Sequence, residues 1–256
     1  MKKELKDIIK STAIGAIQGL FFRLAKDITP LAGTGPILVV APHSDDETLG
    51  CGAFIARARK LGQTVHIVIF TDGLATTVTG TPVSNALIEA RHAEARDAVK
   101  ALGVDAGNLA FLHFPDNGCA RQPDQLESAL QRQIEAVNPR LIMAPYGVDL
   151  HTDHRAIARA MDSLWLKKKV PCPVYEYPIW FWREAAVTHL LQPARLRRLR
   201  KAAAAPFNDV KLAAMKAHRS QCPRSLGGAS DDLFPPRSFM TQFFADYELF
   251  FEREAP

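Results

Sequence analysis

The sequence has few cysteines, no long hydrophobic run and no low-complexity linker. Its four cysteines (Cys51, Cys119, Cys172 and Cys222) include no Cys-x-x-Cys pair, which argues against a disulfide framework and against a cysteine-based zinc site. A reducing cytoplasm is therefore the expected compartment. No Ser/Gly/Pro-rich stretch or internal repeat divides the 256 residues, 47% of which are hydrophobic, so we expect a single domain with a full core.

The N-terminal segment, residues 1–35, is predicted to be an amphipathic helical extension of a body formed by residues 36–256. Lysines followed by apolar residues imitate a signal peptide, but charged residues interrupt the apolar stretch and no cleavage site is evident. Apolar residues instead recur at helical spacing: Ile9, Ala13, Ala16, Ile17, Leu20 and Leu24. Packing against the core or a partner surface is the simpler interpretation, and peripheral attachment at the inner face of a membrane is the alternative.

From residue 36 onward, short apolar strands alternate with amphipathic helices. Strands are predicted over 36–41, 64–70, 108–113, 140–144 and 173–178, and helices over 48–61, 85–102, 123–138 and 154–168. This alternation predicts an α/β fold of Rossmann-like architecture, in which helices cover both faces of a largely parallel sheet.

Two polar motifs follow two of the predicted strands. His43-Ser44-Asp45-Asp46-Glu47 comes after the first strand, and His151-Thr152-Asp153-His154 comes after the fourth. If the strand order is the common 3-2-1-4-5, the first and fourth strands are neighbours, and the loops that follow them diverge to open a crevice. The fold therefore predicts one site from residues more than a hundred positions apart.

Spacing within each motif separates the chemical roles. His43 and Asp46 lie three positions apart and can face one metal ion, whereas Asp45 must project differently and can accept a proton from metal-bound water. His151 and His154 are also three apart: one can bind metal as neutral imidazole, and the other, if protonated, can stabilise an oxyanion. Two imidazoles and one carboxylate suit zinc and leave a coordination position for water.

Three other interpretations of these motifs are open. The acidic residues could merely favour the N-terminus of helix 48–61, but that leaves His43 and the second histidine pair unexplained. Two histidines and a carboxylate also fit a non-haem iron oxygenase, which the alternating strands and helices disfavour because such oxygenases are built on β-rich folds. A non-catalytic metal- or sugar-binding homologue would not require Asp45 and His151.

The motifs resemble those of the PIG-L/LmbE-like metal-dependent N-deacetylases, which remove acetyl groups from N-acetylglucosamine-type amino sugars. The family's His-Pro-Asp-Asp-Glu motif is matched by residues 43–47, and its His-x-Asp-His motif is matched by residues 151–154. One residue departs from the first motif: Ser44 stands in place of the proline, and Pro42 lies two places before it. Shorter matches in the family's order extend the resemblance over roughly residues 36–222: Thr48-Leu49-Gly50-Cys51-Gly52, Thr71-Asp72-Gly73, Arg91 with Glu94, Pro115-Asp116 and His218-x-Ser220-Gln221.

The resemblance implies a role for each of several residues. His43, Asp46 and His154 would be the metal ligands, with zinc or else iron as the ion; Asp45 would be the general base, His151 the oxyanion stabiliser and Asp153 the residue that orients a histidine. Arg91, Asp116 and Asn117 are candidate substrate-binding residues, although a helical arginine usually faces solvent and Asp116-Asn117 can simply shape a turn. The expected ligand is a small amino-sugar conjugate, with no cofactor beyond the metal.

The C-terminal half carries further patterns. The basic run 195–201 contributes to the net charge of +5 and is expected to be a solvated helix face or, alternatively, a phosphate- or membrane-binding surface. No nucleic-acid motif accompanies it, so no nucleic-acid partner is expected.

The aromatic residues of 177–182 predict core packing or stacking on a sugar. His218, in a predicted helix over 207–221, is expected on the surface or near the site. Aromatic residues of 239–251 predict a terminal helix packed on the body or on another subunit, which leaves the oligomeric state open.

Overall fold

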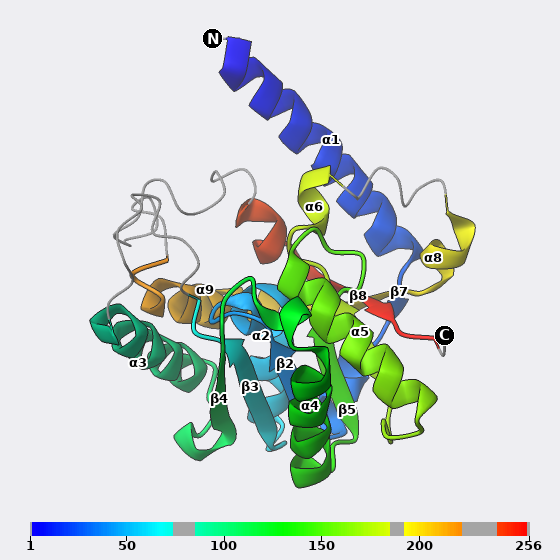
Figure 1. Cartoon of the computed structure of the whole chain (residues 1–256). Helices are drawn as coiled ribbons and strands as arrows, with labels where there is room; N and C mark the ends of the chain where they lie inside the picture. The colour runs from blue at the N-terminus through cyan, green and yellow to red at the C-terminus, as the bar shows by residue number, and fades with distance from the viewer. Residues whose placement is uncertain (1, 74–84, 185–191, 222–239, 255–256) are drawn as a thin grey trace.

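In the computed structural model, which describes residues 2–73, 85–184, 192–221 and 240–254, the strands form one mostly parallel sheet (Figure 1). The five strands expected from the sequence are present: β2 (Ile37–Ala41), β3 (Val65–Thr71), β4 (Leu109–Phe114), β5 (Leu141–Pro145) and β6 (Val174–Tyr177). Their order in the sheet is β4-β3-β2-β5-β6, and neighbouring strands are parallel. The predicted 3-2-1-4-5 order and the Rossmann-like architecture are therefore confirmed.

Helices cover both faces of this sheet, as expected (Figure 1). One face carries α4 (Pro123–Val137) and α5 (Thr152–Leu166), and the other carries α2 (Asp46–Lys60), α3 (Asn85–Ala101) and α9 (Asn208–Ala217). Within β2, Val39 packs into the core on the α2 side, whereas Leu38 and Val40 pack into the core on the α4 side. The chain is a single domain whose central strands are buried on both faces.

Three more strands extend the sheet beyond β6, and here the predicted terminal helix is wrong. β8 (Tyr247–Glu252) pairs antiparallel with β6 and with β7 (Leu199–Ala203), and β1 (Lys26–Asp27) pairs parallel with β7. Among the described residues, the short 3-10 turn η6 (Thr241–Phe244) precedes β8; residue 239 lies outside them. Leu249, Phe250 and Phe251 are all buried, and a short apolar run fits a central strand as well as a helix face.

The basic run 195–201 is not one solvated helix face either. It spans the end of α8 (Pro193–Arg197) and the start of β7. Arg198 Nη2 donates to Glu176 Oε2 at 2.8 Å, Arg200 pairs with Glu252, and Lys201 Nζ donates to the carbonyl of Phe22 at 2.8 Å. Two of the five positive charges of the run are therefore paired with carboxylates within the fold, and a third side chain donates to a backbone carbonyl.

The predicted N-terminal helix is present as α1 (Lys2–Leu24), which projects from the body in Figure 1. Its last turns pack on the body: the ring of Phe21 lies 6.2 Å from those of Phe181 and Trp182, and Gln18 Nε2 donates to the carbonyl of Gln242 at 2.8 Å. No helix within the described ranges has the length and apolar character needed to span a bilayer.

The division of the chain at residue 35 stays a prediction. The short helices are η1 (Thr29–Gly33), η2 (Ala106–Asn108), η3 (Cys119–Arg121), α6 (Phe181–Glu184) and η4 (Ala205–Phe207).

A buried ion pair forms hydrogen bonds with the backbone of α2 where this helix is kinked, one turn after the first motif. Cys51 has non-helical dihedrals (φ −148°, ψ 23°), which kink the helix at this residue. Lys211 Nζ donates to the carbonyl of Leu49 at 2.8 Å, and Glu248 Oε1 accepts from the amide of Ala53 at 2.8 Å. Lys211 and Glu248 are themselves 2.7 Å apart and buried, so α9 and β8 hold the helix that carries the motif.

Replacing Lys211 with methionine should lower the free energy of unfolding by about 3–5 kcal/mol, because the substitution leaves a buried carboxylate and a backbone carbonyl without their partner. Urea unfolding followed by circular dichroism measures the change. The matched control is Arg219→Gln, which removes an exposed pair with Asp97 at 4.0 Å and should change stability by less than about 0.5 kcal/mol. Equal effects of the two substitutions would show that the Lys211–Glu248 pair does not support α2.

Candidate active site

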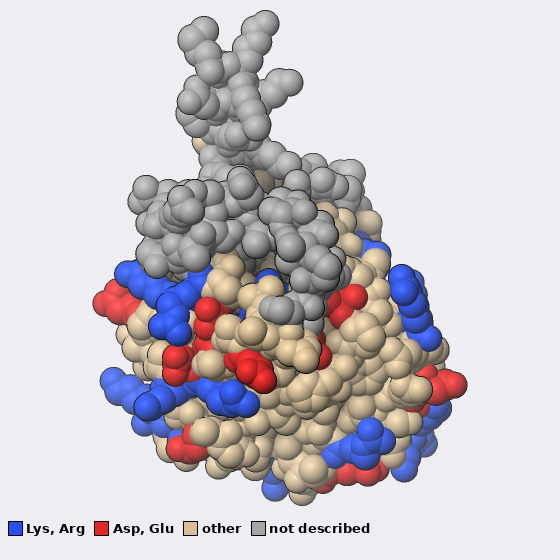
Figure 2. Space-filling view, turned by 60° about the vertical axis from the view of Figure 1, so that its left-hand side comes forward, with Lys and Arg blue, Asp and Glu red and all other residues tan. Residues whose placement is uncertain are grey.

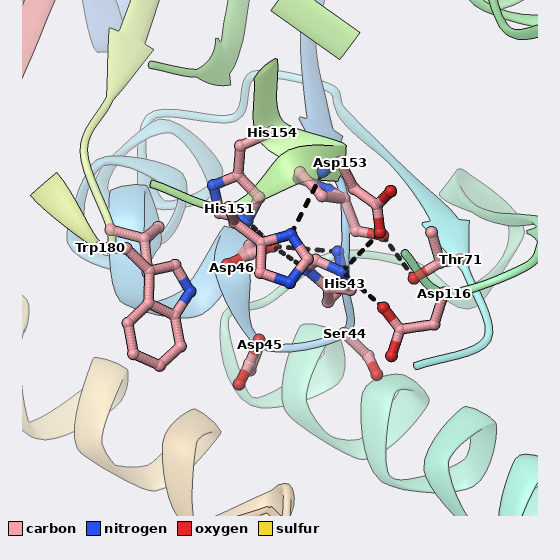
Figure 3. Close-up of polar contacts among 12 residues, drawn as sticks. His43, Ser44, Asp45, Asp46, Thr71, Asp116, His151, Asp153, His154 and Trp180 are labelled. Carbon is pink, nitrogen blue, oxygen red and sulfur yellow. Dashed lines mark hydrogen bonds and ion pairs between the residues drawn. The ribbon is translucent and has the colours of Figure 1, made fainter. Parts of the chain in front are cut away.

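The loop between β2 and α2 holds two adjacent aspartates in different orientations. Asp45 has φ 129°, a conformation that non-glycine residues adopt only when surrounding contacts impose it. Those contacts are hydrogen bonds from the Asp45 amide to Glu47 Oε2 at 3.0 Å and from the Leu49 amide to the Asp45 carbonyl at 2.8 Å. As a result, Asp46 points into the histidine cluster while Asp45 points to the other side of the loop (Figure 3).

The carboxylate of Asp46 lies between two imidazoles. Its Oδ2 is 3.0 Å from His43 Nδ1 and 3.2 Å from His154 Nε2, and it accepts from the His43 amide at 2.9 Å. Burial alone raises the pKa of Asp46, but the charges and hydrogen bonds of His154 and His43 outweigh it and hold the pKa well below its usual range. Asp46 is therefore an ionised group in the interior.

The second ring nitrogen of each of these imidazoles lies close to another carboxylate. His43 Nε2 lies 3.2 Å from both Asp116 and Asp153, and His154 Nδ1 lies 3.4 Å from Asp149. Metal-binding histidines are commonly oriented in this way by a carboxylate behind the ring. Asp153, expected to orient a histidine, contacts His43.

Sequence reasoning missed Asp149. This carboxylate is buried, and its Oδ2 accepts from the amides of Ile179 at 2.9 Å and Trp180 at 3.0 Å in the segment after β6. The one signal in the sequence is its position two residues before His151, which lengthens the second motif to Asp-x-His-x-Asp-His. Its partners, the amides of the two residues Ile179 and Trp180 after β6, are brought to it only by the folding of the chain.

His151 completes a cluster of three imidazoles. The ligand atoms of His43, His151 and His154 lie within 4.8 Å of one another. The amide of Asp153 donates to His151 Nδ1 at 3.3 Å, so the neutral ring carries its proton on Nε2. Burial, followed by the charges of His43 and His154, lowers the pKa of His151 to about 4. His151 is thus a neutral imidazole with an Nε2–H donor near pH 7.

The site has the features of a metal centre. His154 is fully buried, and within the described chain neither of its ring nitrogens has a hydrogen-bond partner of good geometry. Burial lowers the pKa of His154, but Asp46 and Asp149 outweigh it and raise the value to about 9; hydrogen bonds to Asp116, Asp153 and Asp46 likewise raise the pKa of His43 against the effect of burial. Two imidazolium charges thus offset part of the negative charge of Asp46, Asp149 and Asp153. A divalent ion would bring the same charge and release those protons.

Asp45 has the opposite electrostatic environment. It is 7% exposed, and burial, then the negative charge of Asp46, raise its pKa to about 8. Gln221 Nε2 donates to Asp45 Oδ2 at 3.4 Å, and His218 Nε2 lies 3.4 Å from Glu47 Oε1. His218 is fully buried, so a surface position for it is wrong; the segment after α9 instead supports the Asp45 loop.

The candidate substrate-binding residues surround this cluster. Arg91 is 7% exposed rather than solvent-facing, and its guanidinium interacts electrostatically with Asp45 and Asp116. The amide of Asn117 donates to Asp153 Oδ2 at 2.7 Å, so this turn also braces the histidines. In the aromatic segment 177–182, only Trp180 is partly exposed, and Figure 3 shows it flanking the cluster on the side opposite Asp116. Their contacts with substrate stay a prediction.

Comparison with known proteins agrees with this geometry. Residues 38–165 match the PIG-L family, described as GlcNAc-PI de-N-acetylase. The chain is 29% identical over 191 residues to the uncharacterized deacetylase YaiS of Escherichia coli, covering 72% of this chain and 90% of that protein. It is 27% identical over 217 residues to the probable N-acetyl-alpha-D-glucosaminyl L-malate deacetylase 2 of Bacillus subtilis, covering 82% of this chain and 94% of the relative.

A solved structure shares the same fold. The conserved protein TT1542 of Thermus thermophilus is 28% identical, with a TM-score of 0.56, over 86% of this chain and 95% of its own. The family match begins in β2 and ends in α5, and so it contains both histidine motifs and the strand order that brings them together. The chain therefore belongs to the PIG-L family of deacetylases.

Proposed function

We propose that the protein is a metal-dependent hydrolase that removes the acetyl group from the nitrogen of an N-acetylglucosamine-type amino sugar or its conjugate. The observation that carries this proposal is the division of labour between Asp46, held between two imidazoles, and Asp45, which faces away with a pKa of about 8. Membership of the family supports deacetylation, and the name of the Bacillus subtilis relative supports an amino-sugar substrate.

His43, Asp46 and His154 would hold the ion, zinc or iron, and His151 would stand beside it. Zinc-like ions supply two effects when bound: they acidify a coordinated water and polarise the carbonyl of the scissile amide. The separations of 3.0 and 3.2 Å between Asp46 Oδ2 and the two ring nitrogens support this ligand set, because two ligand atoms about 2.0–2.1 Å from a tetrahedral ion lie roughly 3.3 Å apart.

The protein's own groups move the protons. Asp45 accepts a proton from the attacking water and later donates it to the departing amine nitrogen; burial, which raises its pKa, makes this carboxylate a stronger proton acceptor than an exposed one. His151 donates from Nε2–H to the oxyanion that forms on the amide oxygen. Because its Nδ1 already accepts from the Asp153 amide, a neutral His151 can do this, and the protonated form expected from the sequence is not required.

The surrounding residues provide contacts for a sugar. Trp180 can stack an exposed part of its indole on the apolar face of a pyranose ring, and the buried guanidinium of Arg91 can donate to hydroxyl or phosphate oxygens. Asp116 already contacts His43 at 3.2 Å, so it would link substrate binding to the position of that imidazole.

The decisive experiment measures acetate release by metal-stripped protein reloaded with Zn²⁺ or Fe²⁺, over a panel of free, nucleotide-linked and lipid-linked N-acetylamino sugars. Asp45→Asn should keep its metal by elemental analysis but lose about 10²–10⁴-fold in kcat, because an amide cannot accept the proton. His154→Ala should lose the metal itself. Asp105→Asn, at an exposed position, is the matched control. Full activity of metal-free protein would defeat the mechanism, and equal metal loss in both active-site variants would make Asp45 a ligand.

The raised pKa of Asp45 also predicts how the stability of the metal-free protein varies with pH. The folded state keeps this proton up to about pH 8, whereas the unfolded chain loses it near pH 3.9. The contribution of Asp45 to the free energy of unfolding is therefore fully present below about pH 4 and is lost as the pH rises through 8. Asp45→Asn, measured in EDTA by calorimetry, should accordingly be more stable than the unmodified protein at pH 8–9, by up to several kcal/mol, with the gap closing toward pH 4. A gap that is independent of pH would contradict this environment for Asp45.

A lipid-linked substrate would bring the protein to an anionic membrane. Membrane contact through α1 and the basic run 195–201 stays a prediction. If it occurs, the protein should sediment with anionic vesicles and not with neutral ones at low salt. Binding should weaken as the ionic strength passes about 0.1 M, where the Debye length falls to about 10 Å. Arg197→Gln should reduce it, because this arginine is exposed whereas Arg198 and Arg200 are paired within the fold. No sedimentation at any salt concentration would leave core packing as the role of α1.

A further inference from the structure

A second group of metal-ligating side chains lies outside the set assigned to the active site. Asp72 follows β3, His92 lies on α3 and His113 lies in β4. Asp72 Oδ1 is 3.1 Å from His92 Nε2 and 2.9 Å from His113 Nδ1, and ligand atoms of all three residues lie within 4.8 Å of one another. None of the three has a role in the proposed reaction.

The backbone of β4 is shaped to direct His113 at Asp72. In the pairing of β3 with β4, Ile69 stands opposite Phe111 but Thr71 stands opposite Phe114, so β4 contains one extra residue. His113 lies in this bulge with φ 57°. A bulge re-aims a side chain that regular alternation would direct elsewhere, and histidine is among the few non-glycine residues enriched at positive φ. The local irregularity of the strand therefore creates the cluster.

The cluster has an apolar base and an open side. The ring of His92 packs on that of Phe111 with their centroids 4.1 Å apart, which fixes the imidazole. Side-chain exposure rises from 12% for His92 and 18% for Asp72 to 60% for His113. The face to which α3 and β4 belong comes forward in Figure 2, where acidic and basic side chains are intermixed. An ion can therefore reach ligands that are already positioned.

The chemistry of the three groups selects a class of ion. Two imidazoles and one carboxylate suit zinc, cobalt or nickel, whereas calcium and magnesium prefer oxygen ligands. The nitrogen–oxygen separations of 2.9 and 3.1 Å are slightly shorter than the roughly 3.3 Å expected between two ligands of a tetrahedral zinc ion. Small side-chain rotations would admit an ion and leave a coordination position for water.

We propose that Asp72, His92 and His113 form a second site for a borderline divalent transition metal. It binds more weakly than the active-site set, because His113 is largely exposed and water competes for the ion. The proposal does not depend on the deacetylase activity, since it concerns residues and a ligand class outside that reaction.

The experiment titrates metal-stripped, full-length protein with Co²⁺ alone and follows both the bound metal by equilibrium dialysis and the visible absorption of the cobalt complex. The expected result is a tight first equivalent and a weaker second one. His113→Asn removes the imidazole at a positive-φ position that asparagine tolerates, and His92→Gln removes the other ring. Each should weaken the second equivalent by at least about tenfold, since even groups behind a metal ligand are worth about 10–100-fold in affinity.

Three further measurements keep the outcome unambiguous. His66→Gln, a histidine of β3 outside the cluster, is the matched control and should leave both equivalents unchanged. His154→Ala should lose the first equivalent and keep the second, so failure of the active-site assignment and failure of this proposal are distinguishable. Thermal melts of the metal-free variants report whether they fold. A single equivalent in the unmodified protein, or a second equivalent that persists unchanged in folded His113→Asn and His92→Gln, would overturn the site and leave a hydrogen-bonded triad only.

Discussion

The ionised carboxylate of Asp46 is the constraint around which the rest of the site is arranged. A buried negative charge must be balanced, and here the balance comes from the amide of His43 and from two imidazoles, one in the loop after β2 and one in the first turn of α5. The carboxylate also stands at the first residue of α2, so the position of that helix sets its position. Because α2 is broken at Cys51 and closed by Lys211 and Glu248, elements from the C-terminal part of the chain hold the carboxylate in place.

Adjacent residues of identical chemistry acquire opposite properties in this loop. Asp45 and Asp46 share one helix N-terminus, yet burial with like charges around it raises the pKa of the first, while two imidazoles lower that of the second. The φ of 129° at Asp45 turns the two side chains apart and so produces the difference. Pairs of titratable groups driven apart in this manner give one fold two carboxyl groups that differ in protonation state near neutral pH.

The sequence was sufficient for the parts of the structure that depend on local pattern and on the general behaviour of parallel sheets. The alternation of strands and helices predicted β2 to β6 in their order, and that order alone joined His43 to His154. It was insufficient where the outcome depends on which segments meet at long range. Asp149 acts through amides after β6, His218 reaches Glu47 from the end of α9, and the Phe250 region becomes a strand because β6 and β7 flank it. None of these partnerships has a spacing or period that a single sequence displays.

A long-range contact restrains the start of the first motif from the neighbouring strand. Position 44 holds serine, so no proline ring fixes φ inside the motif itself. The amide and the hydroxyl of Thr71 both donate to the carbonyl of Pro42 at 2.9 Å, which fixes the start of the loop that carries His43. Asp72 is the next residue after Thr71, so one backbone connection places both clusters of imidazoles and carboxylates. The ends of neighbouring parallel strands thus act as a common frame, and residues distant in sequence become a site because the strands that carry them stop at the same edge.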